Sequence, residues 1–197
     1  MISLSVKLYL MKEGTIDDVI GSNDQDVIAN AQESLSASNL PADIQDAVAL
    51  AIETLITTST PPVHLDLIHT LAITEIVRQI GTEVDMETME SVPSLQTVLR
   101  AMGHLIDYNL DAHFFSNPPP PFKAIDAAGT PHDIGYLDPD EVTELADVLS
   151  AADLNDNQLD EFSEEYGIEL MEELIEPLCE ALDEASAQGL EIVVLSG

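Results

Sequence analysis

The stretch YGIELMEELIEPLCEALDEASAQGLEIVVLS, residues 166–196, determines the predicted fold of this chain. It predicts an amphipathic helix, a turn at Gly189 and a short strand. Apolar residues recur at steps of three or four and form the stripe expected to face a core: Met171, Leu174, Ile175, Leu178, Leu182 and Ala185. Gly189 can take the left-handed conformation that ends a helix. Residues 192–195 are apolar and mostly β-branched, and they are too few for a helix, so they need a strand partner.

A partner for this strand is present at the other end of the chain. Residues 2–10 have apolar side chains at the even positions and serine, lysine or tyrosine at the odd ones. This period of two is typical of a β-strand. Helical spacing recurs between the two ends, over residues 24–35, 41–57, 63–80, 94–106 and 138–149. The sequence therefore predicts an α+β fold: a mostly helical single domain over residues 1–197, whose small sheet includes the N-terminal and C-terminal strands.

Two segments between the helices are predicted to lack regular structure. Residues 82–93 are mostly polar, so we expect a loop or a weak turn of helix there. The segment at about 110–134 is a Pro-rich connector with four consecutive prolines, which should cross the surface as polyproline II. Its P-x-x-P spacing has two interpretations, a ligand for an SH3-type groove or a rigid connector. In the second case it would be packed by the nearby phenylalanines Phe114, Phe115 and Phe122.

Acidity is the strongest compositional feature of the chain. Five Lys and Arg stand against 38 Asp and Glu, which gives a formal net charge of −33. Such a charge repels phosphate backbones and anionic lipid, so we expect no nucleic acid and no membrane among the partners. Residues 124–197 hold 21 of the 38 acids and no Lys or Arg. The possible partner that this charge favours is a basic protein.

The expected cellular location follows from cysteine usage and from the hydropathy pattern. Cys179 is the single cysteine, so it cannot form an internal disulfide, and a buried free thiol suits a reducing compartment. No stretch has the ~18 apolar residues of a membrane span, and the first residues lack the pattern of a signal peptide. We therefore expect a soluble cytoplasmic protein.

One stretch has the oxygen spacing of a calcium-binding loop. In residues 153–164, oxygen-bearing side chains occupy positions 1, 3, 5, 9 and 12, as in an EF-hand. These candidate ligands are Asp153, Asn155, Asn157, Glu161 and Glu164. Gln158 stands where a glycine normally makes the sharp turn, and Asp160 stands where the loop is normally apolar. We assign no metal and no other cofactor. Ca²⁺ is the candidate for this stretch, and a capped turn between two helices is the other interpretation.

Histidines and nucleophiles identify no catalytic residue. Asp66 and His69 are three residues apart on one predicted helix, as are His104 and Asp107 on another. The two pairs could form a zinc or iron site if their helices were neighbours, and otherwise each histidine would bond to its own carboxylate. The sequence has no nucleophile elbow, phosphate-binding loop or dinucleotide motif. We predict no catalytic residue, and whether the protein is an enzyme stays open.

Two short motifs carry a resemblance to a known group. Residues 20–24, IGSND, follow the first strand, and residues 135–142, GYLDPDEV, precede a helix; a last helix then passes through Gly189 into a terminal strand. In these features the chain resembles the YfbM-like family of uncharacterised bacterial proteins. The resemblance implies a small cytoplasmic α+β domain, and it carries over no catalytic residue.

These observations favour a protein-binding domain of inhibitor, immunity-like or regulatory type, without catalysis. Opposed potentials accelerate encounter with a basic partner and disfavour wrong partners. The predicted partner-binding residues lie on the polar side of the last helix: Glu169, Glu172, Glu173, Glu176, Glu180, Asp183 and Glu184. The alternative is a salt-adapted cytoplasmic enzyme or metal-binding protein, whose acidity is a general property of its surface. The oligomeric state is not predicted.

Overall fold

The computed structural model describes residues 6–58, 62, 65–84, 95–110, 114, 117–122, 134–167 and 169–196. Within them, the centre is an antiparallel sheet with the strand order β2-β1-β4-β3. The strands are β1 (Val6–Lys12), β2 (Thr82–Val84), β3 (Ile134–Leu137) and β4 (Leu190–Ser196). The fold is therefore α+β, as predicted.

The first and last strands are neighbours in the middle of the sheet. Their register runs from Val6 opposite Ser196 to Lys12 opposite Leu190. This pairing confirms the strand partner predicted for the apolar run at the end of the chain. The short strand β2 adds to the outer edge of β1, with Tyr9 opposite Glu83. The prediction of a loop at residues 82–84 was wrong, while residues 85–93 lie outside the described ranges.

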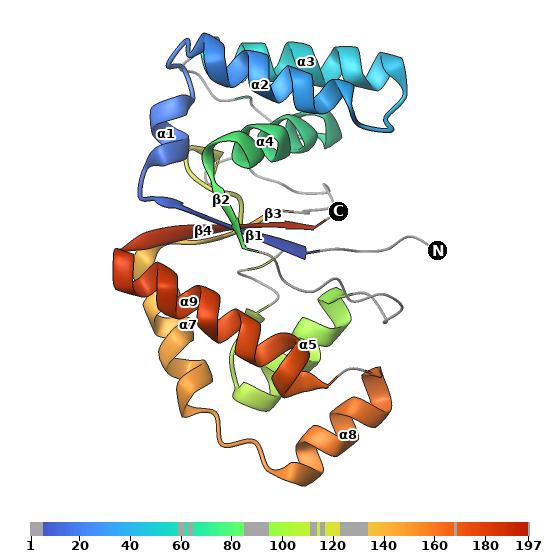
Figure 1. Ribbon diagram of the computed structural model, residues 1–197, viewed down its shortest axis with the longest axis vertical. Coiled ribbons are helices and arrows are strands. Elements are labelled where there is room, and N and C mark those ends of the chain that lie inside the picture. The colour runs from blue at the N-terminus through green and yellow to red at the C-terminus, as the bar shows by residue number, and fades with distance from the viewer. Residues whose placement is uncertain are drawn as a thin grey trace.

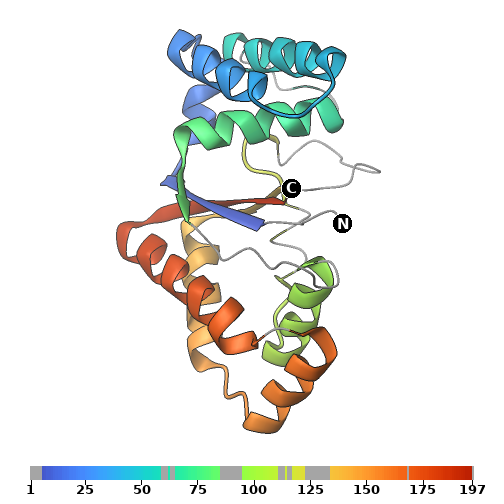
Figure 2. The ribbon, with the colours of Figure 1, turned by 45° about the vertical axis from the view of Figure 1, so that its right-hand side comes forward.

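Helices cover both faces of the sheet (Figures 1 and 2). On one side lie α1 (Thr15–Val19), α2 (Gln25–Ser36), α3 (Ala42–Thr57) and α4 (Leu67–Ile80). On the other side lie α5 (Leu95–Ile106), α7 (Pro139–Ala151), α8 (Asp156–Tyr166), the π-helical turn η2 (Leu170–Ile175) and α9 (Glu176–Gln188). Among the described helices, none is both long and apolar enough to cross a bilayer.

Each sheet face has its own hydrophobic core, because successive strand residues point to opposite faces. Leu8 and Leu10 of β1 pack with α7 and α9, whereas Tyr9 and Met11 pack with α2, α3 and α4. Tyr9 is only 2% exposed, so the odd positions of β1 do not form a solvent face. The most apolar predicted helix, now α4, lies between the sheet and the α2–α3 pair (Figure 1).

The last helix has the two faces that its sequence predicts. Its apolar residues Leu174, Ile175, Leu178, Leu182 and Ala185 are buried. Gly189 ends α9 with a φ of +62°, in the left-handed conformation. The helix begins later than residue 166, because α8 extends to Tyr166 and ends at Gly167, which is also left-handed.

The Pro-rich connector departs from its prediction. Pro118 and Pro119 are buried, so this segment does not run across the surface. Phe114 belongs to the core under α7 and α9, whereas Phe122 belongs to the core under α2, α3 and α4. The described part of the connector thus joins the two cores, with Pro118 and Pro119 buried and Pro120 and Pro121 partly exposed. This arrangement favours the rigid connector over an SH3 ligand.

Candidate functional site

The carboxylates predicted to bind a partner point away from the core. Exposed residues in η2, α9 and the turn before them are Glu169, Glu172, Glu176, Glu180, Asp183 and Glu184. The side chain of Glu173 lies outside what the structure describes. The neighbouring helix α7 exposes Asp140, Glu144 and Asp147. We call the exposed acids of α7, η2 and α9, together with Glu169, the α7–α9 face.

The α7–α9 face is carried by two neighbouring helices. The two helices lie side by side under the sheet (Figure 1), and the side-chain oxygens of Thr143 and Ser186 are 3.2 Å apart. The N-terminal half of α7 therefore meets the last turn of α9, and the helices run antiparallel. Residues 134–196 contain no Lys or Arg, so nothing within this segment neutralises the face.

Two basic side chains with carboxylate partners lie away from this face. Lys7 of β1 pairs with Glu83 of β2, and Arg78 of α4 pairs with Glu75 of the same helix. Both pairs neutralise acids at the β2 edge or in the α1–α4 layer, away from the α7–α9 face.

The calcium-loop candidates do not form a loop. Asn155 caps α8, and its side chain and that of Gln158 form a capping box with each other's backbone N–H groups. The helix begins at Asp156, which is position 4 of the proposed loop, so Asn157, Glu161 and Glu164 are helical. An EF-hand loop instead wraps its ligands around the ion before the next helix is established. These residues are therefore a capped helix start, which was the other interpretation.

The two histidine pairs are not brought together. Asp66 caps α4, accepting the backbone N–H of His69 at 3.0 Å and lying 2.7 Å from its Nδ1. The backbone hydrogen bond is the main reason that the pKa of Asp66 is lowered. His104 and Asp107 lie at the end of α5, on the opposite side of the sheet (Figure 1). Across the described ranges, no three His, Cys, Asp or Glu side chains are placed to hold a metal.

Cys179 has the environment of an unreactive thiol. It lies half-buried on α9, and burial, followed by the charges of Asp183 and Glu176, raises the pKa of its thiol. A raised pKa keeps the sulfur protonated at neutral pH, and the thiolate is the nucleophilic form.

The end of α5 carries a larger, open pocket of about 280 Å³. Its lining is mixed in charge and comprises Arg100, Gly103, His104, Asp107, Tyr108, Asn109 and Leu110. The backbone at Tyr108 approaches Gly103 closely. A Cβ added at Gly103 would lie 2.4 Å from the backbone oxygen of Tyr108.

A smaller pocket contains a buried carboxyl group that the sequence analysis missed. Glu191 of β4 is only 2% exposed. Its Oε2 accepts hydrogen bonds from the Tyr136 hydroxyl at 2.9 Å and from the Gly14 backbone N–H at 3.3 Å. The pocket has a volume of about 120 Å³ and is lined by Glu13, Gly14, Ile16, Asp17, Pro120, Tyr136 and Glu191. The one available sequence signal was a single acid in an otherwise apolar strand.

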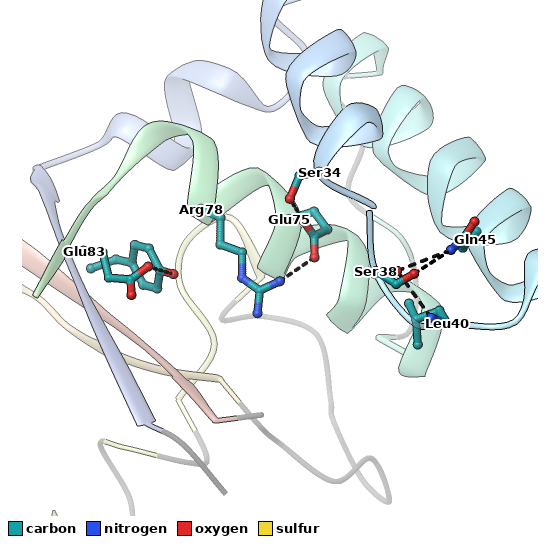
Figure 3. A network of polar contacts seen from close by, with 8 residues as sticks. Ser34, Ser38, Leu40, Gln45, Glu75, Arg78 and Glu83 are labelled. Atoms are coloured by element: carbon teal, nitrogen blue, oxygen red, sulfur yellow. Dashed lines mark hydrogen bonds and ion pairs between the residues drawn. The ribbon is translucent and has the colours of Figure 1, made fainter. Parts of the chain in front are cut away.

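Glu191 contrasts with the other deeply buried glutamate. Glu75 of α4 is 6% exposed, and each of its carboxylate oxygens has a partner (Figure 3). Oε1 lies 2.6 Å from the Arg78 guanidinium, and Oε2 accepts the Ser34 hydroxyl at 2.9 Å. The Ser34–Glu75 hydrogen bond joins α2 to α4, so Glu75 has a structural role. Among the described residues, no Lys, Arg or His pairs with Glu191, and burial is the largest cause of its raised pKa.

Comparisons with known proteins give a family without a function. A family model described as a domain of unknown function, DUF7691, matches residues 2–195. No curated protein and no solved structure matches the chain. The resemblance to YfbM-like proteins stays a prediction.

Proposed function

We propose that this chain, which belongs to the DUF7691 family of domains of unknown function, is a binding protein whose α7–α9 face docks a basic protein. Its role would be of inhibitor, immunity-like or regulatory type, in the cytoplasm and without catalysis. The observation that carries the proposal is the set of exposed carboxylates on two adjacent helices, in a segment without any Lys or Arg.

The helices hold these charges on a rigid support. Leu178 and Leu182 of α9 and Leu145 of α7 are fully buried beneath the face. The carboxylates therefore keep their positions relative to one another. Such a fixed field attracts a basic surface over a distance and orients it during encounter. Salt should weaken the attraction, because the Debye length is about 10 Å at 0.1 M ionic strength.

The second candidate is general salt adaptation of an enzyme or metal-binding protein. One observation favours it: the opposite helical layer also exposes acids. On α2 and α3 these are Asp26, Glu33, Asp43, Asp46 and Glu53. If acidity only adapts the surface to salt, removing acids from either layer should change the affinity for a basic protein equally.

A matched pair of variants distinguishes local docking from general acidity. One variant carries Glu176→Gln, Glu180→Gln and Asp183→Asn on α9. The control carries Asp43→Asn, Asp46→Asn and Glu53→Gln on α3, which changes the net charge equally on the other layer. The probes are a lysine-rich peptide and a panel of folded basic proteins, measured by surface plasmon resonance at low and raised KCl.

The proposal expects the α9 variant to lose affinity mainly through a slower association rate, while the α3 control stays near the unmodified chain. Equal losses in the two variants would favour general acidity. Absence of binding by any probe at low ionic strength would contradict the proposal.

A further inference from the structure

We propose that the pocket between the start of α1 and the sheet binds a primary ammonium group, with Glu191 at its buried end and Glu13 and Asp17 at its mouth. The site lies on the α1–α4 side, because Glu191 shares a strand face with Val193 and Leu195, which belong to that core. It is therefore separate from the α7–α9 face and does not depend on the function proposed for it.

The pocket runs from solvent to the interior. Glu13 and Asp17 are exposed, whereas Tyr136 and Glu191 are buried. Gly14, which follows Glu13 in the chain, has a φ of +79° and donates its N–H to Glu191. The volume of about 120 Å³ is well above the ~10–15 Å³ that one water needs. A group of several heavy atoms can therefore enter.

One oxygen of the buried carboxyl group is unused. Both donors, Tyr136 and Gly14, bond to Oε2. No hydrogen bond from the residues that the structure describes reaches Oε1. A buried carboxylate without a cation or a full set of donors is costly. Glu75 in this same chain has both oxygens satisfied and a guanidinium beside it. The pocket at Glu191 therefore has the acceptors for a cationic donor and lacks the donor.

The lining selects an ammonium group among cations. Three carboxyl groups and no Lys, Arg or His line the pocket. They are not clustered closely enough to hold a metal ion, since no such group occurs among the described residues. An ammonium group is compact and carries three N–H donors, so it can bond to Oε1 of Glu191 without gathering several carboxyl groups around itself. A guanidinium is a larger planar fork that suits bidentate surfaces better.

Ligand binding should be linked to the protonation of Glu191. Burial, together with the charges of Asp17 and Glu13, raises the pKa of this carboxyl group. A bound ammonium favours the ionised form and lowers that pKa again. Affinity should therefore increase as the pH rises through the pKa of the unliganded carboxyl group.

The test uses the full chain, labelled with ¹⁵N, and follows the amide resonance of Gly14. The probes are methylammonium chloride and Nα-acetyl-lysine amide, which separate a free amine from a lysine side chain as the source of the ammonium. Controls at equal ionic strength are KCl and tetramethylammonium chloride, which has no N–H donor. We expect a saturable shift with at least one ammonium probe and none with the controls. Equal shifts with all salts, or no saturable shift, would overturn the proposal.

Variants locate the site. Glu191→Gln keeps the shape and removes the charge, so we expect at least about tenfold weaker binding. Asp17→Asn lies at the exposed mouth, where it does not endanger folding, and should weaken binding by about twofold to fivefold. Asp18→Asn is the matched control, because Asp18 is exposed on the same helix and does not line the pocket. Equal affinity in the Asp17 and Asp18 variants would place the ligand elsewhere and refute this site.

Discussion

Tyr136 donates a 2.9 Å hydrogen bond to Oε2 of Glu191, and both residues are almost completely buried. They lie on the neighbouring strands β3 and β4, where Tyr136 pairs with Val193. Glu191 is two residues from Val193 and shares its face of the sheet. Burial and the nearby carboxyl group raise the pKa of Tyr136, so the phenol stays a donor at physiological pH. The Tyr136 hydroxyl thus bonds to one of the two carboxyl oxygens of Glu191 across the sheet.

Replacing Tyr136 by phenylalanine should lower the free energy of unfolding by about 1–2 kcal/mol, because a buried carboxyl group loses a donor. Urea unfolding measures the change. The control is Tyr9→Phe: Tyr9 is equally buried at 2% exposure, but its partner Glu83 has a side chain 39% exposed. Water can replace that donor, so the control should lose less. Equal losses would show that the buried Tyr136–Glu191 hydrogen bond stabilises the fold no more than the Tyr9–Glu83 bond does.

The Glu191→Gln variant should change how stability depends on pH. The pKa of Glu191 is raised above its ordinary value of 4.5, so the folded chain holds this proton more tightly than the unfolded chain does. The resulting stabilisation is complete below the ordinary pKa and is lost as the pH rises through the raised one. The stability of the unmodified chain relative to the variant should therefore fall across this window. Urea unfolding at several pH values checks it, and a constant difference would contradict it.

The sheet could be predicted from sequence where the pattern is local. The alternation in β1 and the apolar run of β4 each identify a strand, and their pairing follows because the strands need partners. Strand β2 was missed because three residues, two of them exposed, have no detectable period. Its position depends on β1, where Lys7 and Tyr9 both contact Glu83.

The pocket at Glu191 could not be predicted from spacing. Its contacts come from Gly14 and Tyr136, which are 177 and 55 residues away in sequence. Tertiary packing alone brings them together. The buried prolines were missed for a similar reason: composition places Pro118 outside regular structure, but it does not show that the connector passes between two cores. Residues on helix surfaces, such as Glu176, were predictable because helical period decides their exposure.

Asp138→Ala should cost about 1 kcal/mol of stability, because it removes a helix cap. The Asp138 side chain accepts the backbone N–H of Glu141 at 2.9 Å, and the Glu141 side chain accepts the backbone N–H of Asp138 at 2.9 Å. Thermal unfolding measures the loss. Asp140→Ala in the same first turn is the control, since Asp140 does not form the capping box. A larger loss in the control would disprove the role of the cap.

Gly189→Ala should destabilise the fold by about 1 kcal/mol, because an L-residue is strained in the left-handed conformation. The φ of +62° at this position connects α9 to β4. A Cβ added here would meet no neighbouring side chain or backbone atom within 4 Å, so the substitution tests strain alone. Gly189→Asn should cost less, since asparagine tolerates this conformation. If alanine and asparagine cost the same, backbone conformation is not the cause.

Thermal unfolding across KCl concentrations should separate a local anionic face from salt adaptation. Neighbouring carboxylates such as Glu176 and Glu180 are four residues apart on one helix, at about 5–6 Å. The Debye length falls from about 10 Å at 0.1 M to about 3 Å at 1 M, so most of this repulsion is screened by about 1 M. The docking proposal therefore expects the melting temperature to rise and then level off, with a smaller rise in the Glu176→Gln, Glu180→Gln, Asp183→Asn variant than in the α3 control. A melting temperature that climbs steeply beyond 1 M in all three proteins would support salt adaptation instead.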